Sequence, residues 1–284
     1  MRVLIVGGTS MVGRRLRAQL APTSAVSTAG RGGGSDLEFD LAATGPVPDP
    51  GTACDALVHC AASFGGETPE GRARNELVNA LGAFRVAELA AAANCRHVVY
   101  LSSLSGDDHP SNGYFGSYGL SKRHGSENLA LACSSAGIAF TSLVLTQVYD
   151  EHGEARKHQP LFYHIVDRAS RGEDVVLFGR SDAVRNYLFV GDVATIIARV
   201  IAGQVAGTFP CTAPVSYRLS EVATMAFEVF DRGGQVRFDP SRPDIPTVYL
   251  PDDRRLDEAI GYRPATELRE GLARIRDSRA EEVT

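Results

Sequence analysis

The chain opens with a strand, a glycine-rich turn and the start of a helix, and this order restricts the fold more than any other feature. The segment reads Val3-Leu4-Ile5-Val6-Gly7-Gly8-Thr9-Ser10-Met11-Val12-Gly13. In such a unit, the backbone N–H groups of the turn and the positive end of the helix can bind a pyrophosphate. We therefore expect a dinucleotide-binding site, with contacts from Gly7, Thr9, Ser10, Met11, Val12 and Gly13.

Short runs rich in β-branched residues alternate with helical stretches up to about residue 145. This alternation predicts parallel strands joined by right-handed crossovers, which is a Rossmann-type, doubly wound α/β fold. The expected strands are residues 3–6, 25–29, 37–39, 56–60, 97–102 and 139–145, and the expected helices are residues 11–20, 70–93 and 114–136. The loops 63–66 and 105–116 follow strands, where such a sheet binds its ligands.

After residue 149 the predicted elements become shorter and prolines more frequent, which indicates a smaller C-terminal lobe. We expect a dinucleotide-binding domain at residues 1–150, to which residues 185–207 return. The smaller substrate-binding lobe comprises residues 151–184 and 208–284. Its expected features are a polar loop at 151–159, helices at 160–171 and 192–202, strands at 175–178 and 187–190, and a solvated tail at 277–284.

The charge balance of 29 basic and 34 acidic residues argues against binding to nucleic acid or an anionic membrane, so we expect a small-molecule substrate. The five cysteines contain no Cys-x-x-Cys pair, and they predict neither a disulfide framework nor a metal site. No apolar run approaches the ~20 residues of a membrane span, and the first residues do not form a signal peptide. A cytoplasmic location is the expectation.

The second predicted strand bears on the choice of nicotinamide cofactor. An acidic residue at its end would bind a ribose 2′-hydroxyl, whereas an arginine would attract a 2′-phosphate. This strand ends Ser27-Thr28-Ala29-Gly30-Arg31, without a carboxylate. The sequence therefore favours NADP over NAD, with Arg31 as the residue that decides. A solvated loop arginine is the alternative.

Tyr118 and Lys122 lie four residues apart in a predicted helix and therefore share a face. Moving a tyrosine pKa from ~10 toward 7 requires about 4 kcal/mol, which Lys122 and a cationic nicotinamide ring can share. Ser103 ends a strand at the same sheet edge, where its hydroxyl can hold a substrate oxygen while Tyr118 exchanges the proton. We expect Ser103, Tyr118 and Lys122 to be catalytic.

In these motifs the chain resembles the extended short-chain dehydrogenase/reductase family, the NAD-dependent epimerase/dehydratase group that acts on nucleotide sugars. The resemblance also covers the segment Asp40-Leu41, where the family contacts adenine, and Asn79 with Gly82 in the long helix. It implies that the cofactor contacts, besides Tyr118 and Lys122, include Asp40, Leu41, Cys60, Ala61, Ala62 and Asn79.

The C-terminal part carries two arginines of the same resemblance. Arg185 begins a segment similar to the family's Arg-Asp-Tyr-x-x-Val-x-Asp-x-Ala, and Arg242 begins one similar to its Arg-Pro-Gly-Asp turn. Family arginines at these positions hold the substrate diphosphate, which suits the bidentate guanidinium group. The implied substrate contacts are Ser63, Ser103, Tyr149, Arg185 and Arg242. Surface ion pairing is the alternative for the two arginines.

Departures from the family pattern bear on the reaction. Leu104 and Ser105 stand where the family's dehydratases carry an Asp-Glu pair, which argues against a 4,6-dehydratase. Asp150 replaces the usual glycine, and Val144 stands where an arginine is common. These differences leave room for an unusual or smaller substrate.

Three functions are open at this point. The main prediction is an NADP-dependent reductase of a nucleotide-activated keto sugar, and the alternative is an NAD-dependent 4-epimerase that oxidises C4 and returns the hydride to the other face. A non-catalytic NAD(P)-binding regulator is the third, because fold alone does not establish function. The resemblance also implies a homodimer that pairs through residues 70–93 and 114–136, with an alanine-rich face at Ala87, Ala90 and Ala91.

Overall fold

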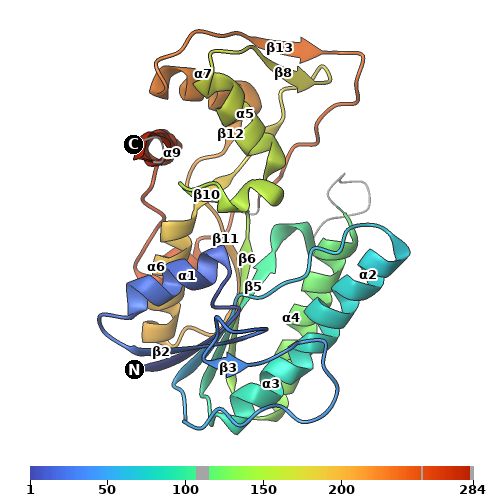
Figure 1. Ribbon diagram of the computed structural model, residues 1–284, viewed down its shortest axis with the longest axis vertical. Coiled ribbons are helices and arrows are strands. Elements are labelled where there is room, and N and C mark those ends of the chain that lie inside the picture. Colours follow the sequence, from blue (N-terminus) through green and yellow to red (C-terminus); the bar gives the residue numbers. More distant parts are fainter. Residues whose placement is uncertain (107–114, 251, 282–284) are drawn as a thin grey trace. The chain divides into compact units, whose positions relative to one another are not determined.

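The structure is a computed structural model that describes residues 1–106, 115–250 and 252–281 (Figure 1). The chain divides into two compact units. The first comprises Met1–Leu145, Ala194–Cys211 and Asp253–Tyr262, and the second Thr146–Val193, Thr212–Asp252 and Arg263–Thr284.

A parallel sheet forms the centre of the first unit. In the described residues it has seven strands in the order β11-β6-β5-β4-β1-β2-β3. Strand order reverses next to β1, as in doubly wound folds, whose ligands bind at this point. The Rossmann-type α/β prediction is confirmed. The strands are β1 (Arg2–Val6), β2 (Ala25–Gly30), β3 (Leu37–Glu38), β4 (Ala56–His59), β5 (His97–Ser103), β6 (Ala139–Leu145) and β11 (Gly207–Cys211).

Helices cover both faces of this sheet, which explains the near-continuous apolar character of β1 and β4. Figure 1 shows α1 (Met11–Leu20) and α6 (Val190–Gly203) on one side, with residues 194–203 of α6 belonging to the first unit. On the other side lie α2 (Pro69–Asn75), α3 (Gly82–Ala92) and α4 (Ser117–Ser135). The short helix α8 (Arg255–Ile260) also belongs to this unit.

The predicted helix at 70–93 is not continuous. A π-helical turn, η1 (Glu76–Leu81), separates α2 from α3. Hydrophobic periodicity does not distinguish such a turn from an α-helical one, so the sequence did not reveal it. The helix predicted at 114–136 begins at Ser117, after an extended Gly116, and Tyr114 lies outside the described residues.

The described part of the second unit contains three two-stranded sheets and several helices around an aromatic core. The strand pairs are β7 (Gln147–Tyr149) with β10 (Tyr187–Phe189), β9 (Val184–Arg185) with β12 (Tyr217–Arg218), and β8 (Val175–Phe178) with β13 (Val236–Asp239). The helices are η3 (Glu154–Lys157), α5 (Pro160–Ser170), α7 (Leu219–Val229) and α9 (Leu268–Glu281). Tyr149, Phe162, Tyr163 and Phe189 are almost fully buried.

Two segments of this unit are more ordered than the sequence predicted. The expected solvated tail at 277–284 is helical as far as Glu281, because Ile275 and Ser278 pack inward and Ser278 Oγ lies 2.9 Å from His152 Nδ1. The expected loop at 151–159 contains the 3₁₀ helix η3. Asp150 organises this segment, since its carboxylate accepts hydrogen bonds from the N–H groups of residues 152, 154 and 155 at 2.9–3.0 Å. The aspartate that replaces the family's glycine therefore stabilises the loop.

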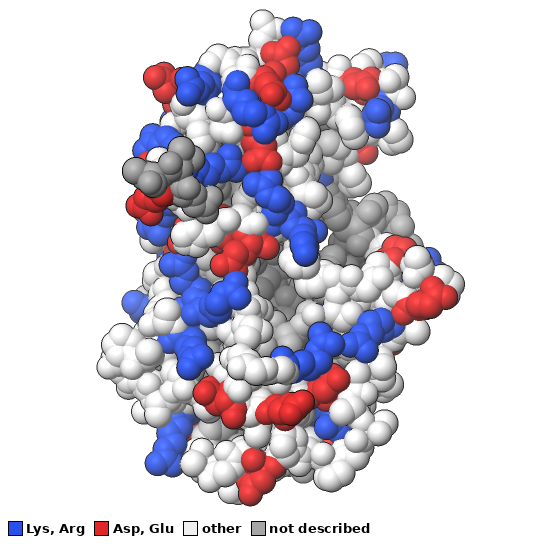
Figure 2. Space-filling view, viewed as in Figure 1, with Lys and Arg blue, Asp and Glu red and all other residues white. Residues whose placement is uncertain are grey.

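On the face shown in Figure 2, basic and acidic side chains are interspersed rather than gathered by sign. Within the described residues, no helix is both long and apolar enough to cross a membrane.

Candidate active site

The turn between β1 and α1 has no room for side chains at two of its glycines. Gly7 adopts a φ of +85°, and a Cβ there would lie 2.6 Å from the backbone nitrogen of Ala61. A Cβ on Gly13 would lie 2.3 Å from the Gly7 carbonyl oxygen. Ser10 closes the turn, because its Oγ accepts the Gly13 N–H at 3.1 Å and donates to the Gly7 carbonyl at 2.8 Å. Thr9, Ser10, Met11 and Val12 keep part of their surface exposed.

This turn fits a pyrophosphate, because backbone can approach closely where a Cβ is missing and the first N–H groups of a helix have no intrahelical acceptor. The residues of the turn are therefore suited to hold the phosphates of a nicotinamide dinucleotide.

A carboxylate that the sequence analysis missed lies beside β2. Asp36 Oδ2 accepts hydrogen bonds from the N–H and the Oγ1 of Thr28, both at 2.8 Å, and these bonds lower the pKa of Asp36. Thr28 itself borders the phosphate turn, since a Cβ on Gly8 would lie 2.3 Å from its Cγ2. The sequence did not reveal Asp36, because it is the pairing of β2 with β3 that brings Asp36 next to Thr28. Arg31 is exposed on the intervening loop.

The other predicted cofactor residues of the first half follow β3 and β4. Asp40 Oδ1 accepts the Ala42 N–H at 2.9 Å, and Leu41 is buried against Gly82, where a Cβ would lie 2.9 Å from the Leu41 Cβ. The N–H groups of Cys60 and Ala61 donate to the Val6 carbonyl at 2.8 and 3.1 Å, and Ala62 is half-buried after them. These segments lie at the carboxyl ends of two parallel strands of the same sheet, with β1 and β2 between them.

Ser103 ends β5, and the first turn of α4 packs against the residues that follow it. A Cβ on Gly119 would lie 2.2 Å from the Ser105 carbonyl oxygen, so this glycine allows the close approach. Ser103 Oγ lies 2.8 Å from Ser105 Oγ and accepts the Ser105 N–H at 3.3 Å. The structure thus shows Ser105 as a hydroxyl partner of Ser103. Ser105 follows Ser103 by only two residues, and this short spacing in the sequence could have indicated that the two hydroxyls meet.

Lys122 is buried on α4 with 2% of its surface exposed. Its Nζ lies 4.1 Å from the centroid of the Tyr100 ring, a cation–π contact. Burial lowers the pKa of Lys122 to about 7, against a smaller opposing effect of Cys60. Burial also raises the pKa of the Cys60 thiol to about 12. Near neutral pH, Lys122 therefore exchanges between ammonium and amine.

Tyr118 lies on the same helix, and the ring of Phe64 stacks on it with centroids 4.2 Å apart. Burial raises the pKa of Tyr118. The Tyr118–Lys122 spacing predicted that Lys122 helps to lower this pKa, but in the protein without ligands desolvation dominates. The phenol therefore keeps its proton until a further positive charge enters the site. Nothing in the sequence pattern singled out Phe64.

Asn79 is buried, and its side chain joins two predicted site segments. The amide binds the backbone of Ser63 through two hydrogen bonds and donates to Ser121 Oγ, one residue before Lys122. Ser63, a predicted substrate contact, is thereby anchored. In this conformation the Asn79 side chain holds the loop after β4, through Ser63, and helix α4, through Ser121.

The remaining predicted substrate residues belong to the second unit. Tyr149 has no exposed surface and packs against Phe162 and Phe189, so it belongs to the aromatic core and presents no surface to a ligand. Arg185 is 1% exposed, and its Nη1 donates to the carbonyls of Val184 and Pro246. Burial lowers the pKa of Arg185.

Arg242 is exposed, and its guanidinium makes two contacts. The group lies 4.5 Å from the centroid of the Phe178 ring, and its Nε lies 3.5 Å from Asp239 Oδ2. The contact with Asp239 is the surface ion pair that the sequence analysis kept as an alternative.

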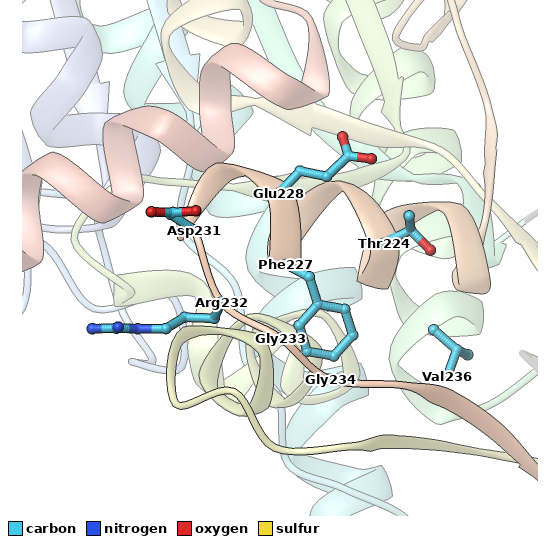
Figure 3. Close-up of a pocket in the computed structure, with 8 residues that line it drawn as sticks. All are labelled: Thr224, Phe227, Glu228, Asp231, Arg232, Gly233, Gly234 and Val236. Carbon is cyan, nitrogen blue, oxygen red and sulfur yellow. The ribbon is translucent and has the colours of Figure 1, made fainter.

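A separate pocket of about 450 Å³ opens at the end of α7 in the second unit (Figure 3). It contains none of the predicted site residues. The lining residues are Thr224, Phe227, Glu228, Asp231, Arg232, Gly233, Gly234 and Val236.

A Rossmann-type sheet with a phosphate turn, together with Ser103 on β5 and Tyr118 and Lys122 on α4, defines a short-chain dehydrogenase/reductase-type enzyme. A model of the NAD dependent epimerase/dehydratase family matches residues 3–209. The chain belongs to this family, as its sequence motifs implied.

Relatives with known or assigned functions include several epimerases. The chain is 23% identical over 211 residues to a "Putative UDP-glucose 4-epimerase" from Methanocaldococcus jannaschii, which covers 70% of this chain and 68% of that protein. The fold resembles that of UDP-glucose 4-epimerase from Thermotoga maritima, solved with UDP-glucose, with a TM-score of 0.78, 19% identity and full coverage of both chains. UDP-glucose 4-epimerase from Thermus thermophilus, solved with NAD, has a TM-score of 0.74, 21% identity and 98% coverage of both chains. These solved structures share the fold of this chain.

Proposed function

We propose that the protein is an NAD-dependent 4-epimerase of a nucleotide sugar. The observation that carries this proposal is the family match together with Ser103, Tyr118 and Lys122 at the carboxyl edge of the sheet. The residues after Ser103 support epimerisation over dehydration. Ser105 is hydrogen-bonded to Ser103 where a family dehydratase would carry an acid.

The reaction uses Tyr118 as the group that takes and returns a proton. NAD, when bound, supplies a reversible hydride acceptor. Tyr118 removes the proton of the sugar 4-hydroxyl while Ser103 holds the same oxygen, and Lys122 adds positive charge beside the phenol. After the 4-keto sugar turns over within the site, the hydride would return to the opposite face of C4 while Tyr118 returns the proton to the oxygen, and the opposite configuration would result.

We propose NAD rather than NADP as the cofactor. Asp36 supports this choice, because its carboxylate stands beside β2 where a 2′-phosphate would meet like charge. Arg31, which led the sequence analysis to NADP, is the residue to test. If Arg31 bound a 2′-phosphate, Arg31→Ala would weaken NADPH binding and leave NADH binding unchanged.

Arg185 and Arg242 of the second unit are proposed as diphosphate ligands, and Ser63 of the first unit is proposed as a substrate contact. Both arginines carry charge suited to phosphate. The Arg185 Nη1 donates to two backbone carbonyls, which orients the guanidinium. A cytoplasmic location also stays a proposal.

A homodimer is proposed through α3 and α4 and the π-helical turn before them. Ala87 and Ala90 pack into the core, with 6% and 0% of their surface exposed, whereas Ala91 is exposed. The exposed large apolar side chains of η1 and α3 are Leu77, Leu81 and Phe84. They are three and four residues apart and form one stripe, which we call the Leu81 stripe.

The first experiment identifies the nucleotide that the purified protein retains and then follows UDP-glucose and UDP-N-acetylglucosamine by NMR without added cofactor. Retained NAD and conversion to the 4-epimer are expected. A requirement for stoichiometric NADPH would instead indicate the reductase. Tyr118→Phe is the matched control, and it should retain NAD binding while conversion stops.

A further inference from the structure

The loop after β4 is clamped on both sides of Phe64 by two buried asparagines. Asn79 binds both backbone groups of Ser63, accepting its N–H at 2.7 Å and donating to its carbonyl at 2.9 Å. Asn75 Oδ1 accepts the Gly65 N–H at 2.7 Å. Asn75 and Asn79 are 0% and 1% exposed. Two residues that flank Phe64 are therefore held by side chains that the core itself fixes.

The same two asparagines reach the helix that carries Tyr118. Asn75 Nδ2 donates to Ser117 Oγ at 2.8 Å, and Asn79 Nδ2 donates to Ser121 Oγ at 2.9 Å. Ser117 precedes Tyr118, and Ser121 Oγ also donates to the Tyr118 carbonyl at 2.8 Å. Each asparagine thus connects the Phe64 loop to the turn of α4 that holds the general base.

Two further contacts close this loop. Glu67 Oε1 accepts the N–H of Ser117 at 2.9 Å, so the loop also binds the first turn of α4 through its far end. Gly65 packs on Gly71, where a Cβ would lie 2.3 Å from the Gly71 carbonyl oxygen. The loop is fixed from α2, from η1 and from α4.

The result of this clamping is a nearly parallel stack of Phe64 on Tyr118. The rings are tilted by 16°, with centroids 4.2 Å apart, and Phe64 keeps 49% of its surface exposed. Stacking at this separation is favourable beyond the apolar area that it buries. Because about half of the Phe64 side chain is exposed, it adds little to the packing of the core. Its main effect is to cover one face of the Tyr118 ring.

We propose that Phe64, clamped by Asn75 and Asn79, is a positioning residue for proton transfer by Tyr118: its ring holds the plane of the phenol and keeps water from that face. The proposal rests on the proposed function, because it assigns the proton transfer to Tyr118. It predicts that shortening Phe64 exposes the phenol without unfolding the protein.

The first test needs neither substrate nor cofactor. Nitration of Tyr118 by tetranitromethane is followed by peptide mass spectrometry in wild type, Phe64→Leu, Phe64→Tyr and Phe238→Leu. Phe238 is 40% exposed in the second unit and serves as the matched control. We expect about threefold faster nitration of Tyr118 in Phe64→Leu only, since water and reagent then reach the phenol. Equal rates in Phe64→Leu and wild type at every pH would overturn the shielding.

The second test separates positioning from shielding. In Phe64→Leu we expect kcat to fall about tenfold with little change in KM, because a misplaced base slows the reaction step more than binding. Burial raises the pKa of Tyr118, so exposure lowers it and shifts the acid limb of the kcat profile to lower pH. Phe64→Tyr should restore both values.

The outcomes distinguish this inference from the proposed function. Faster nitration with an unchanged kcat and pH profile would overturn the positioning role. If wild type converts no nucleotide sugar, the proposed function fails, and faster nitration in Phe64→Leu still supports the shield. Asn75→Ala gives an independent check, since loss of the clamp should also accelerate nitration of Tyr118.

Discussion

The Nζ atom of Lys122 lies 4.1 Å from the centroid of the Tyr100 ring, and the Tyr100 hydroxyl donates to the Lys122 carbonyl at 3.2 Å. Tyr100 therefore holds both the backbone and the charge of the lysine that serves the site. The cation–π contact offsets only part of the cost of burial, because the pKa of Lys122 still falls from 10.5 to about 7.

The cost of burying the Lys122 charge predicts that the free energy of unfolding depends on pH. Between pH 7 and 10.5 the unfolded chain holds the Lys122 proton and the folded chain does not, so the contribution of Lys122 to stability rises with pH. We expect Lys122→Met to be more stable than wild type by about 5 kcal/mol at pH 6 and about 2 kcal/mol at pH 9. Urea unfolding at both pH values measures this. Lys157→Met, at an exposed lysine, is the control, and a pH-independent gain in Lys122→Met would contradict the prediction.

Gly13 in the phosphate turn and Gly33 in the loop after β2 should respond differently to substitution by alanine. A Cβ on Gly13 would meet the Gly7 carbonyl oxygen, whereas a Cβ on Gly33 would meet nothing within 4 Å. We expect Gly13→Ala to weaken NADH binding about tenfold or more, because the turn must shift, and Gly33→Ala to leave it unchanged. Fluorescence titration with NADH compares them. Equal affinities in the two variants would argue against the turn as the phosphate site.

The Asn79 side chain makes three hydrogen bonds in a buried place. Asn79→Ala leaves their partners unsatisfied, so we expect a loss of about 3 kcal/mol in the free energy of unfolding. Asn128 donates one hydrogen bond, to the Ala80 carbonyl, and Asn128→Ala should cost about 1 kcal/mol. Chemical denaturation gives both values, and similar losses would show that the Asn79 contacts carry little energy.

The Leu81 stripe predicts how the proposed dimer would dissociate. Leu81 is 57% exposed, and a charge there would be buried without a partner in a helix-to-helix interface. We expect wild type to have a dimer mass and Leu81→Glu a monomer mass in light scattering at micromolar concentration. Tyr249→Glu, at a side chain that is 81% exposed in the second unit, should leave the mass unchanged. A monomeric wild type would exclude the dimer.

Much of the fold was readable because strand and helix patterns are local. The strands at 139–145 and 175–178 begin and end where the sequence placed them. Strand β11 was missed because it is an edge strand that contains Pro210 and begins at a glycine, and both residues oppose a strand assignment. The tail was misjudged because its helix buries few residues per turn.

The sequence by itself determined the phosphate turn and the Tyr118–Lys122 pair, since each depends on the spacing of a few neighbouring residues. Only the tertiary structure decided that Asp36 returns to Thr28, that Phe64 stacks on Tyr118 and that Lys122 is buried. The physical reason is that strand register and helix packing join residues far apart in the chain. Desolvation, which sets the proton affinities of Tyr118 and Lys122, depends on everything that packs around them.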